Sequence, residues 1–159
     1  MVLPHRISPM RSFSFALCFS ALLSAPLPAL AQSALEFQEE LLETANAAGP
    51  ARLPVACAGL FRALTNLAEE GTDQHKALQE KEQDSGTVAA IARQNETGED
   101  TSAAIDGVVV DIAKVATVYL NWFSANKKAT GELFDDTIKQ NFGDCDRLVG
   151  EWRVALYAE

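Results

Sequence analysis

Apolar residues recur at intervals of three and four positions through most of the chain beyond residue 33, which is the spacing of one face of an α-helix. The plainest example lies in 53–70, where the recurring positions are Leu53, Cys57, Leu60, Leu64 and Leu67. We find no sustained alternation of polar and apolar residues flanked by turn residues, so a sheet is not expected. The pattern therefore predicts an all-α protein.

Short polar or glycine-containing stretches separate the periodic segments. The segments predict helices over 33–48, 53–70, 99–127, 130–141 and 144–158, and a further helix within 71–98 that is followed by a loop at the stretch NETGED. Because short connections favour antiparallel neighbours, we expect a single-domain helical bundle of four main helices plus shorter pieces, occupying residues 32–159.

Residue types that begin or end helices set the expected boundaries. Ser33 with Glu36 three positions later is typical of a capping box at a helix start. Near the end of the chain, Gly143 is expected to end one helix and Asp144 to cap the next.

Two neighbouring segments differ sharply in polarity. Residues 71–98 are polar, and we expect a helix there that is interrupted at Gly86 and contributes little to the core. Residues 99–127 form the most apolar helix after residue 31 and are expected to be the central element of the bundle. Asp106, Asp111 and Lys114 argue against a membrane span in that helix.

The start of the chain has the layout of a secretory signal peptide. The basic stretch MVLPHRISPMR precedes the apolar stretch SFSFALCFSALLSAPLPAL, and small residues follow at Ala29 and Ala31. We expect cleavage between Ala31 and Gln32, which removes Cys18 with residues 1–31. The processed protein is then periplasmic or secreted, without a membrane span.

Removal of the signal segment would make the net charge of the protein more negative. Removal of residues 1–31 takes Arg6 and Arg11 and no acid, so the basic residues fall from 13 to 11 against 22 acidic residues. Nucleic acids and anionic membranes attract the opposite charge, so neither is an expected partner. A protein partner, if charged, is expected to be basic.

Two cysteines, Cys57 and Cys145, remain after processing, and both lie on apolar helix faces. In an oxidising compartment an even pair predicts a disulfide. A reactive thiolate at Cys145 is the alternative, because a helix N-terminus favours one, but Asp144 and Asp146 oppose that charge. A metal site is disfavoured as well, since His75 is the one histidine beyond residue 31.

The motifs of common helical cofactor proteins and enzymes do not occur in the sequence. There is no C-x-x-C-H for haem and no Glu-x-x-His pair for a di-iron centre. A phosphate-binding glycine loop and the G-x-S-x-G motif are also missing. We therefore expect no cofactor and no enzymatic activity.

Two hypotheses for function remain, and both concern binding. In the first, an exported acidic bundle binds a protein in the cell envelope, as an adaptor, inhibitor or chaperone, through the surface of 71–98; the contact residues are Glu80, Glu82 and Asp84. That stretch is equally well read as a linker without a role. In the second, the bundle carries a small apolar ligand between its helices. The lining candidates, which ordinary core packing would also explain, are Phe61, Tyr119, Trp122, Phe123, Phe134 and Trp152.

Overall fold

The computed structural model describes residues 29–158, and every regular element in that range is a helix. The elements are α1 (Ala29–Asn46), η1 (Gly49–Ala51, a 3₁₀ turn), α2 (Arg52–Thr65), α3 (Asp73–Thr97), α4 (Thr101–Thr130) and α5 (Asp136–Tyr157). The predicted all-α bundle is therefore confirmed. The expected signal segment lies outside the described residues, apart from the backbone of residues 29–31, which begins α1.

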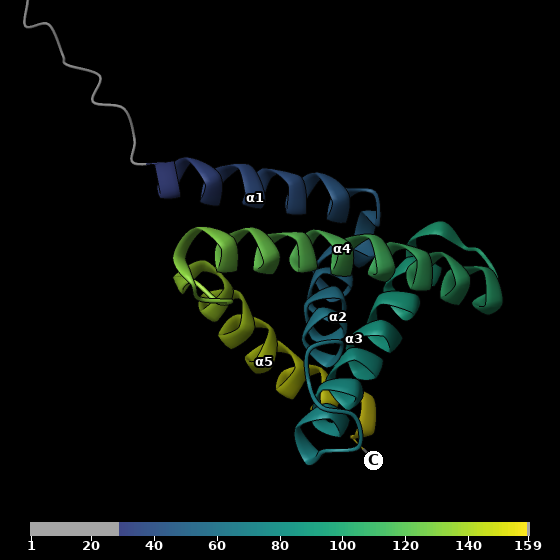
Figure 1. Cartoon of the computed structure of the whole chain (residues 1–159). Helices are drawn as coiled ribbons and strands as arrows, with labels where there is room; N and C mark the ends of the chain where they lie inside the picture. The colour runs from purple at the N-terminus through teal and green to yellow at the C-terminus, as the bar shows by residue number, and fades with distance from the viewer. Residues whose placement is uncertain (1–28, 159) are drawn as a thin grey trace, which may run out of the picture.

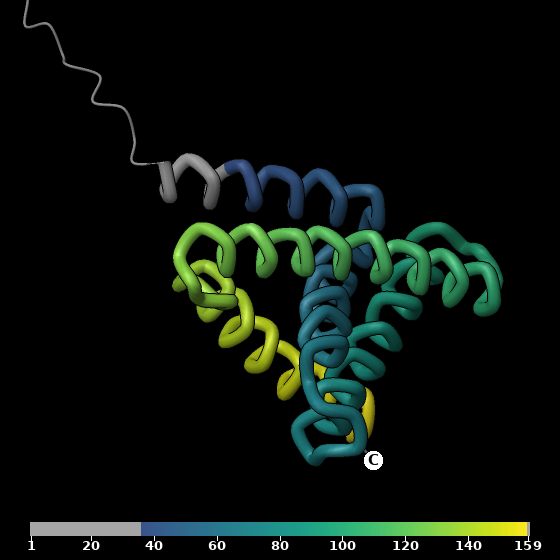
Figure 2. Tube along the Cα trace, viewed as in Figure 1, coloured from purple at the N-terminus to yellow at the C-terminus, as the bar shows by residue number. Residues whose placement is uncertain are grey.

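The chain changes direction at each connection (Figure 1). α1 lies along α4 in the opposite direction, α2 and α3 form an antiparallel pair, and α5 runs from the end of α4 back towards α3. The tube view follows the same path from α1 to the C-terminal end of α5 (Figure 2). Because every other helix packs on it, α2 occupies the interior.

The burial of α2 corrects one expectation. Nine of its 14 residues are buried, whereas the longer α4 buries ten of 30, so α2 and not α4 is the central helix. Gly59 permits the close crossing of these two helices, because a Cβ at this position would lie 2.4 Å from Val115 Cγ1. A larger residue at Gly59 would push α2 and α4 apart.

Aromatic side chains fill the space between α1, α4 and the start of α5. The Phe37 ring stacks on Trp122 with 4.6 Å between ring centroids and meets the edge of Tyr119 at 5.6 Å. The Trp122 indole N–H donates to Asp135 Oδ2 at 3.0 Å, while Asp135 Oδ1 accepts from the backbone N–H of Ile138 and caps α5. One carboxylate thus begins α5 and joins it to α4.

The expected interruption at Gly86 is wrong, because α3 is one continuous helix of 25 residues. Its start is capped by the hydroxyl of Thr72, and it ends at Gly98, whose φ of 69° is left-handed. α3 buries four of its 25 residues against the bundle, Leu78, Asp84, Ser85 and Ala89, and two of these are apolar, so its contribution to the core is small, as expected. A mid-helix glycine costs only about 1 kcal/mol relative to alanine, and packing on α2 exceeds that cost.

Two predicted boundaries are also wrong. α5 continues through Gly143 and Asp144 as one helix of 22 residues, capped instead by Asp135. Ser33 lies inside α1 rather than at its start. In α5, the burial of Ile138, Cys145 and Val149 on both sides of Gly143 holds the two halves in line.

The predicted disulfide is confirmed. Cys57 on α2 and Cys145 on α5 are bonded, with 5.3 Å between their Cα atoms, and both residues are buried. The bond therefore holds α5 to the central helix. Among residues 29–158, no helix combines the length and the apolar character that crossing a membrane requires.

Candidate functional site

The three acids predicted to contact a partner lie on α3 but do not form a free surface. The Asp84 side chain is 7% exposed; it accepts from Arg153 Nε and, at 3.1 Å, from the hydroxyl of Tyr157. Glu80 also pairs with Arg153, at 3.2 Å. The expectation that Asp84 is a surface contact is therefore wrong, because it anchors the last turns of α5 to α3.

The third acid, Glu82, faces α2. Its Oε1 lies 2.8 Å from Arg62 Nη2, and Arg62 Nη1 also points to the backbone carbonyl of Val109 on α4 at 3.5 Å. Arg62 thus ties together three helices. Sequence periodicity placed Glu82 on α3 correctly but gave no sign of this pairing, because Arg62 is 20 positions away.

Replacement of Asp84 separates a structural role from a surface role. We expect Asp84→Asn to lower the free energy of unfolding by about 1–2 kcal/mol, because Arg153 and Tyr157 lose a buried charged acceptor. Glu80→Gln removes an exposed partner of the same arginine and is expected to cost less than about 0.5 kcal/mol. Urea unfolding of both variants measures the difference. Equal costs would contradict the anchoring role of Asp84.

The six aromatics proposed to line a ligand cavity do not share one. Phe61, Tyr119 and Phe123 are fully enclosed core residues, and burial raises the pKa of the Tyr119 hydroxyl. Trp122 and Trp152 are partly buried against the core. Phe134 is the one member of this set that lines a described groove.

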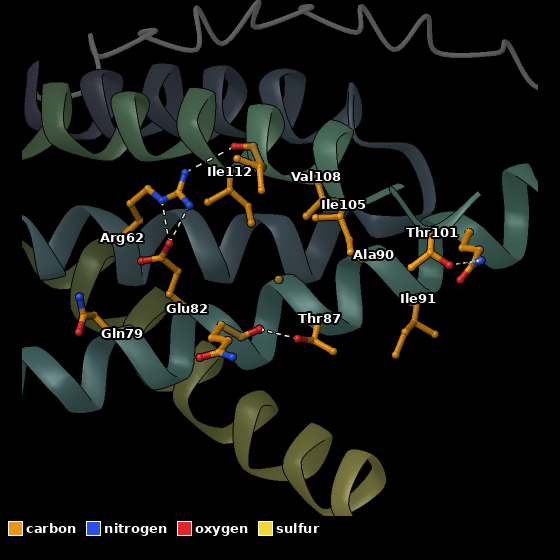
Figure 3. Close-up of a pocket in the computed structure, with 14 residues that line it drawn as sticks. Arg62, Gln79, Glu82, Thr87, Ala90, Ile91, Thr101, Ile105, Val108 and Ile112 are labelled. Atoms are coloured by element: carbon orange, nitrogen blue, oxygen red, sulfur yellow. Dashed lines mark hydrogen bonds and ion pairs between the residues drawn. The ribbon is translucent and has the colours of Figure 1, made fainter. Parts of the chain in front are cut away.

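A groove of about 630 Å³ runs between α3 and α4, with α2 behind it; we call it the α3–α4 groove (Figure 3). The side chains of Ile105, Val108 and Ile112 point from α4 towards Thr87 and Ala90 on α3 (Figure 3). The remaining lining residues are Arg62, Gln79, Glu82, Gln83, Gly86, Ile91, Gln94, Thr101 and Val109.

Polar contacts bound this groove at both ends. Near the α3–α4 connection, the Gln94 amide donates to Thr101 Oγ1 at 3.0 Å. At the other end lies the Arg62–Glu82 ion pair. The charges of Arg62 and Glu82 neutralise each other. The other lining residues combine an apolar floor with uncharged polar side chains.

The groove exists because the apolar stripe of α4 extends beyond the surface that α2 and α3 cover. Val108 and Ile112 are buried, whereas Ile91, Ile105 and Val109 are 45%, 47% and 48% exposed. Ile105 and Val109 belong to the apolar pattern that made 99–127 the expected central helix, yet nearly half of each side chain is exposed. Periodicity identifies such a face but does not determine how much of it a neighbouring helix covers.

An arginine next to the groove holds α3 and α4 together near their connection. Arg93 Nε lies 2.6 Å from Glu99 Oε1, and its Nη1 lies 3.1 Å from the buried Asp111. The hydrogen bond to Glu99 is the main cause that raises the pKa of Arg93. Gly107 leaves room for this guanidinium, since a Cβ there would lie 2.5 Å from Arg93 Cζ. The walls of the groove are therefore fixed relative to each other.

Side chains that could bind a metal ion do not cluster in the part of the chain that the structure describes. Over residues 29–158, no cluster of three or more His, Cys, Asp or Glu side chains could hold a metal ion. His75 is half-buried in the first turn of α3, where its backbone N–H bonds to Thr72.

Comparison with known proteins adds no functional label to this geometry. No family model, no curated protein and no solved structure matches the chain.

Proposed function

We propose that the protein is a non-enzymatic binding protein of the cell envelope whose α3–α4 groove receives an apolar-faced segment of a protein partner. The observation that carries the proposal is the exposure of Ile91, Ile105 and Val109 around one groove of about 630 Å³. Apolar side chains gathered in a concave surface are typical of recognition sites, whereas scattered ones need no explanation.

The lining of the groove favours an amphipathic helix as the bound segment. Gly86 and Ala90 are small, so a partner helix approaches α3 closely. Val108 and Ile112 provide an apolar floor, and the amide of Gln83 is placed to bond to the polar edge of the helix. This arrangement corresponds to helix-in-groove recognition, in which side chains on one face of a helix occupy a hydrophobic groove.

The charge of the protein favours basic residues beside the apolar face of the partner. The chain carries 22 acidic and 13 basic residues, a formal net charge of -9. Such an excess accelerates encounter with a positively charged partner and disfavours acidic ones. We therefore expect basic residues to flank the bound helix without entering the groove.

Substitution inside and outside the groove tests the proposal. The double variant Ile105→Gln, Val109→Gln is expected to lose a partner that the native protein captures from the envelope fraction. With the purified partner, its affinity should fall at least about tenfold, because central apolar contacts contribute most of the binding energy. Pull-down followed by titration calorimetry measures both effects.

Val110→Gln provides the matched control on the same helix. Val110 is 53% exposed and lies outside the lining of the groove, so its replacement is expected to leave capture unchanged. Capture that survives the double variant would contradict the proposal. Equal loss with Val110→Gln would also contradict it, because the effect would then follow the loss of any exposed valine rather than the groove.

A further inference from the structure

A second groove, of about 620 Å³, lies on a different part of the molecule from the α3–α4 groove. It is formed by the end of α2, the α2–α3 connection, the first turns of α3, the α4–α5 connection and the first turns of α5, and we call it the α2–α5 groove. The two grooves share no lining residue. The volume is in the range of roughly 300–1,000 Å³ that small-molecule sites occupy.

The walls of the α2–α5 groove are mainly apolar and are held by the core. The Phe134 ring meets the edge of Phe123 at 5.2 Å, and Phe142 meets Phe61 at 6.1 Å. The apolar lining residues are Leu64, Leu67, Ala68, Ala77, Leu78, Leu133, Phe134, Ile138 and Phe142. Leu67 and Phe134 are 46% and 36% exposed, so the groove is open to an incoming chain.

Lysines line the groove although the protein as a whole is acidic. Lys81 is already engaged, since it pairs with Asp146 and lies 5.6 Å from the centroid of the Phe142 ring. Lys139 pairs with Asp136, but both side chains are highly exposed, so this ion pair contributes little to stability. Lys139 can therefore exchange Asp136 for another anionic partner. Among the residues that line this groove, Glu69 is the one acidic residue.

A smaller hollow adjoins the groove and adds a second available lysine. Leu133, Phe134 and Lys139 line both, and Lys127, from the last turn of α4, lines the hollow. Lys127 forms no ion pair with any residue in 29–158. Two lysines and one acid, Glu132, line the hollow, and Asp136, the exposed partner of Lys139 at 3.2 Å, lies outside the lining.

We propose that the α2–α5 groove binds a monomeric, single-chain amphipathic anion of the fatty-acid class. The hydrocarbon chain lies along the apolar walls, and the carboxylate lies in the hollow lined by Lys127 and Lys139. Burial of the chain provides the attraction, and the two lysines select an anion over a neutral or cationic head group. This site is independent of the partner contact proposed for the α3–α4 groove.

Dodecanoate, kept below the concentration at which it forms micelles, is the probe. In ¹H–¹⁵N spectra of the disulfide-bonded protein, we expect it to shift the amides of Leu67, Leu78 and Ile138 and to leave those of Ile91 and Ile105 unchanged. Dodecanol and dodecyltrimethylammonium are expected to bind at least about tenfold more weakly, since they lack the negative charge. Equal binding of dodecanol, or shifts confined to the α3–α4 groove, would overturn the proposal.

Substitutions at the hollow test the role of the lysines. Lys127→Gln with Lys139→Gln is expected to weaken dodecanoate binding about tenfold, because two exposed charge contacts are lost. Lys128→Gln is the control, since Lys128 is exposed and lines neither the groove nor the hollow. Unchanged affinity for dodecanoate in the double variant would overturn the proposal. Binding of the protein to anionic vesicles without binding to monomeric dodecanoate would overturn it as well. Because the α3–α4 groove is untouched, neither result bears on partner capture.

Discussion

Reduction of the Cys57–Cys145 disulfide is expected to lower the free energy of unfolding by about 4–5 kcal/mol, because the bond closes a loop that spans 88 residues of the unfolded chain. That effect approaches half of the stability of a typical small domain. Equilibrium urea unfolding of the oxidised and reduced proteins, with both sulfurs present in each, measures it directly.

The loss is expected to be largest in α5. Three of its 22 residues are buried, namely Ile138, Cys145 and Val149, and Phe142, Leu148 and Trp152 are partly buried against the core. Without the bond, α5 therefore has fewer buried contacts than α2, in which nine of 14 residues are buried. The pairs of Arg153 with Asp84 and of Lys81 with Asp146 remain, but each has one partner that is substantially exposed. Hydrogen exchange should therefore show that α5 loses protection before α2 does.

The variant Cys57→Ala, Cys145→Ala is the control for the reductant. It is expected to unfold at the same urea concentration with and without reductant, and close to that of the reduced native protein. Coincident unfolding curves for the oxidised and reduced native protein would contradict the prediction. Uniform loss of protection in every helix would refute the particular dependence of α5.

The helices and the disulfide could be predicted from the sequence because each depends on local pattern and residue type. Apolar spacing located the central parts of α1, α2 and α4, whereas in α3 the expected interruption at Gly86 fell at the centre of the helix. Cys57 and Cys145 lay on apolar faces, and two cysteines allow one pairing. Neither inference required knowledge of how the helices cross.

Boundaries were less predictable, because glycine was given more weight than its energetic cost supports. Gly86 and Gly143 both lie inside continuous helices. A glycine in a helix costs about 1 kcal/mol, and neighbouring residues buried on a partner helix readily offset that cost. By contrast Gly98 and Gly131, where the chain adopts positive φ values of 69° and 87°, do end helices. The sequence letter is the same in all four cases, and tertiary packing decides the outcome.

The candidate sites depended on tertiary geometry and could not be predicted from the sequence. Glu80 and Asp84 are one helical turn apart, yet the Glu80 side chain is 66% exposed and that of Asp84 is 7% exposed. Asp84 is in contact with Arg153, which lies 69 positions further along the chain, and this contact helps to cover its side chain. Likewise the α3–α4 groove is present because α2 covers only part of the apolar face of α4. The spacing of apolar residues contains no information on how much of a helix face its neighbours cover.

Gly59→Ala is expected to lower the free energy of unfolding by about 3 kcal/mol, although alanine is the better helix former. The added Cβ would lie 2.4 Å from Val115 Cγ1 and 3.1 Å from the backbone nitrogen of Ala116. A β-branched side chain in a helix has one strongly preferred rotamer, so Val115 has little freedom to turn away. α2 and α4 must therefore separate, at the centre of the core.

Gly86→Ala is the matched control and is expected to have the opposite sign. Its Cβ would meet one atom, Ile112 Cδ1, at 3.5 Å, an ordinary van der Waals distance. The helix propensity of alanine should then raise the free energy of unfolding by about 0.5–1 kcal/mol. Thermal and urea unfolding of both variants measure the pair. In the double variant Gly59→Ala, Val115→Ala, the contact with Cγ1 at 2.4 Å is removed while the contact with the Cβ of residue 115 at 2.7 Å remains. The double variant should therefore lose less stability than the sum of the two single variants, and simple additivity would contradict a close crossing of α2 and α4.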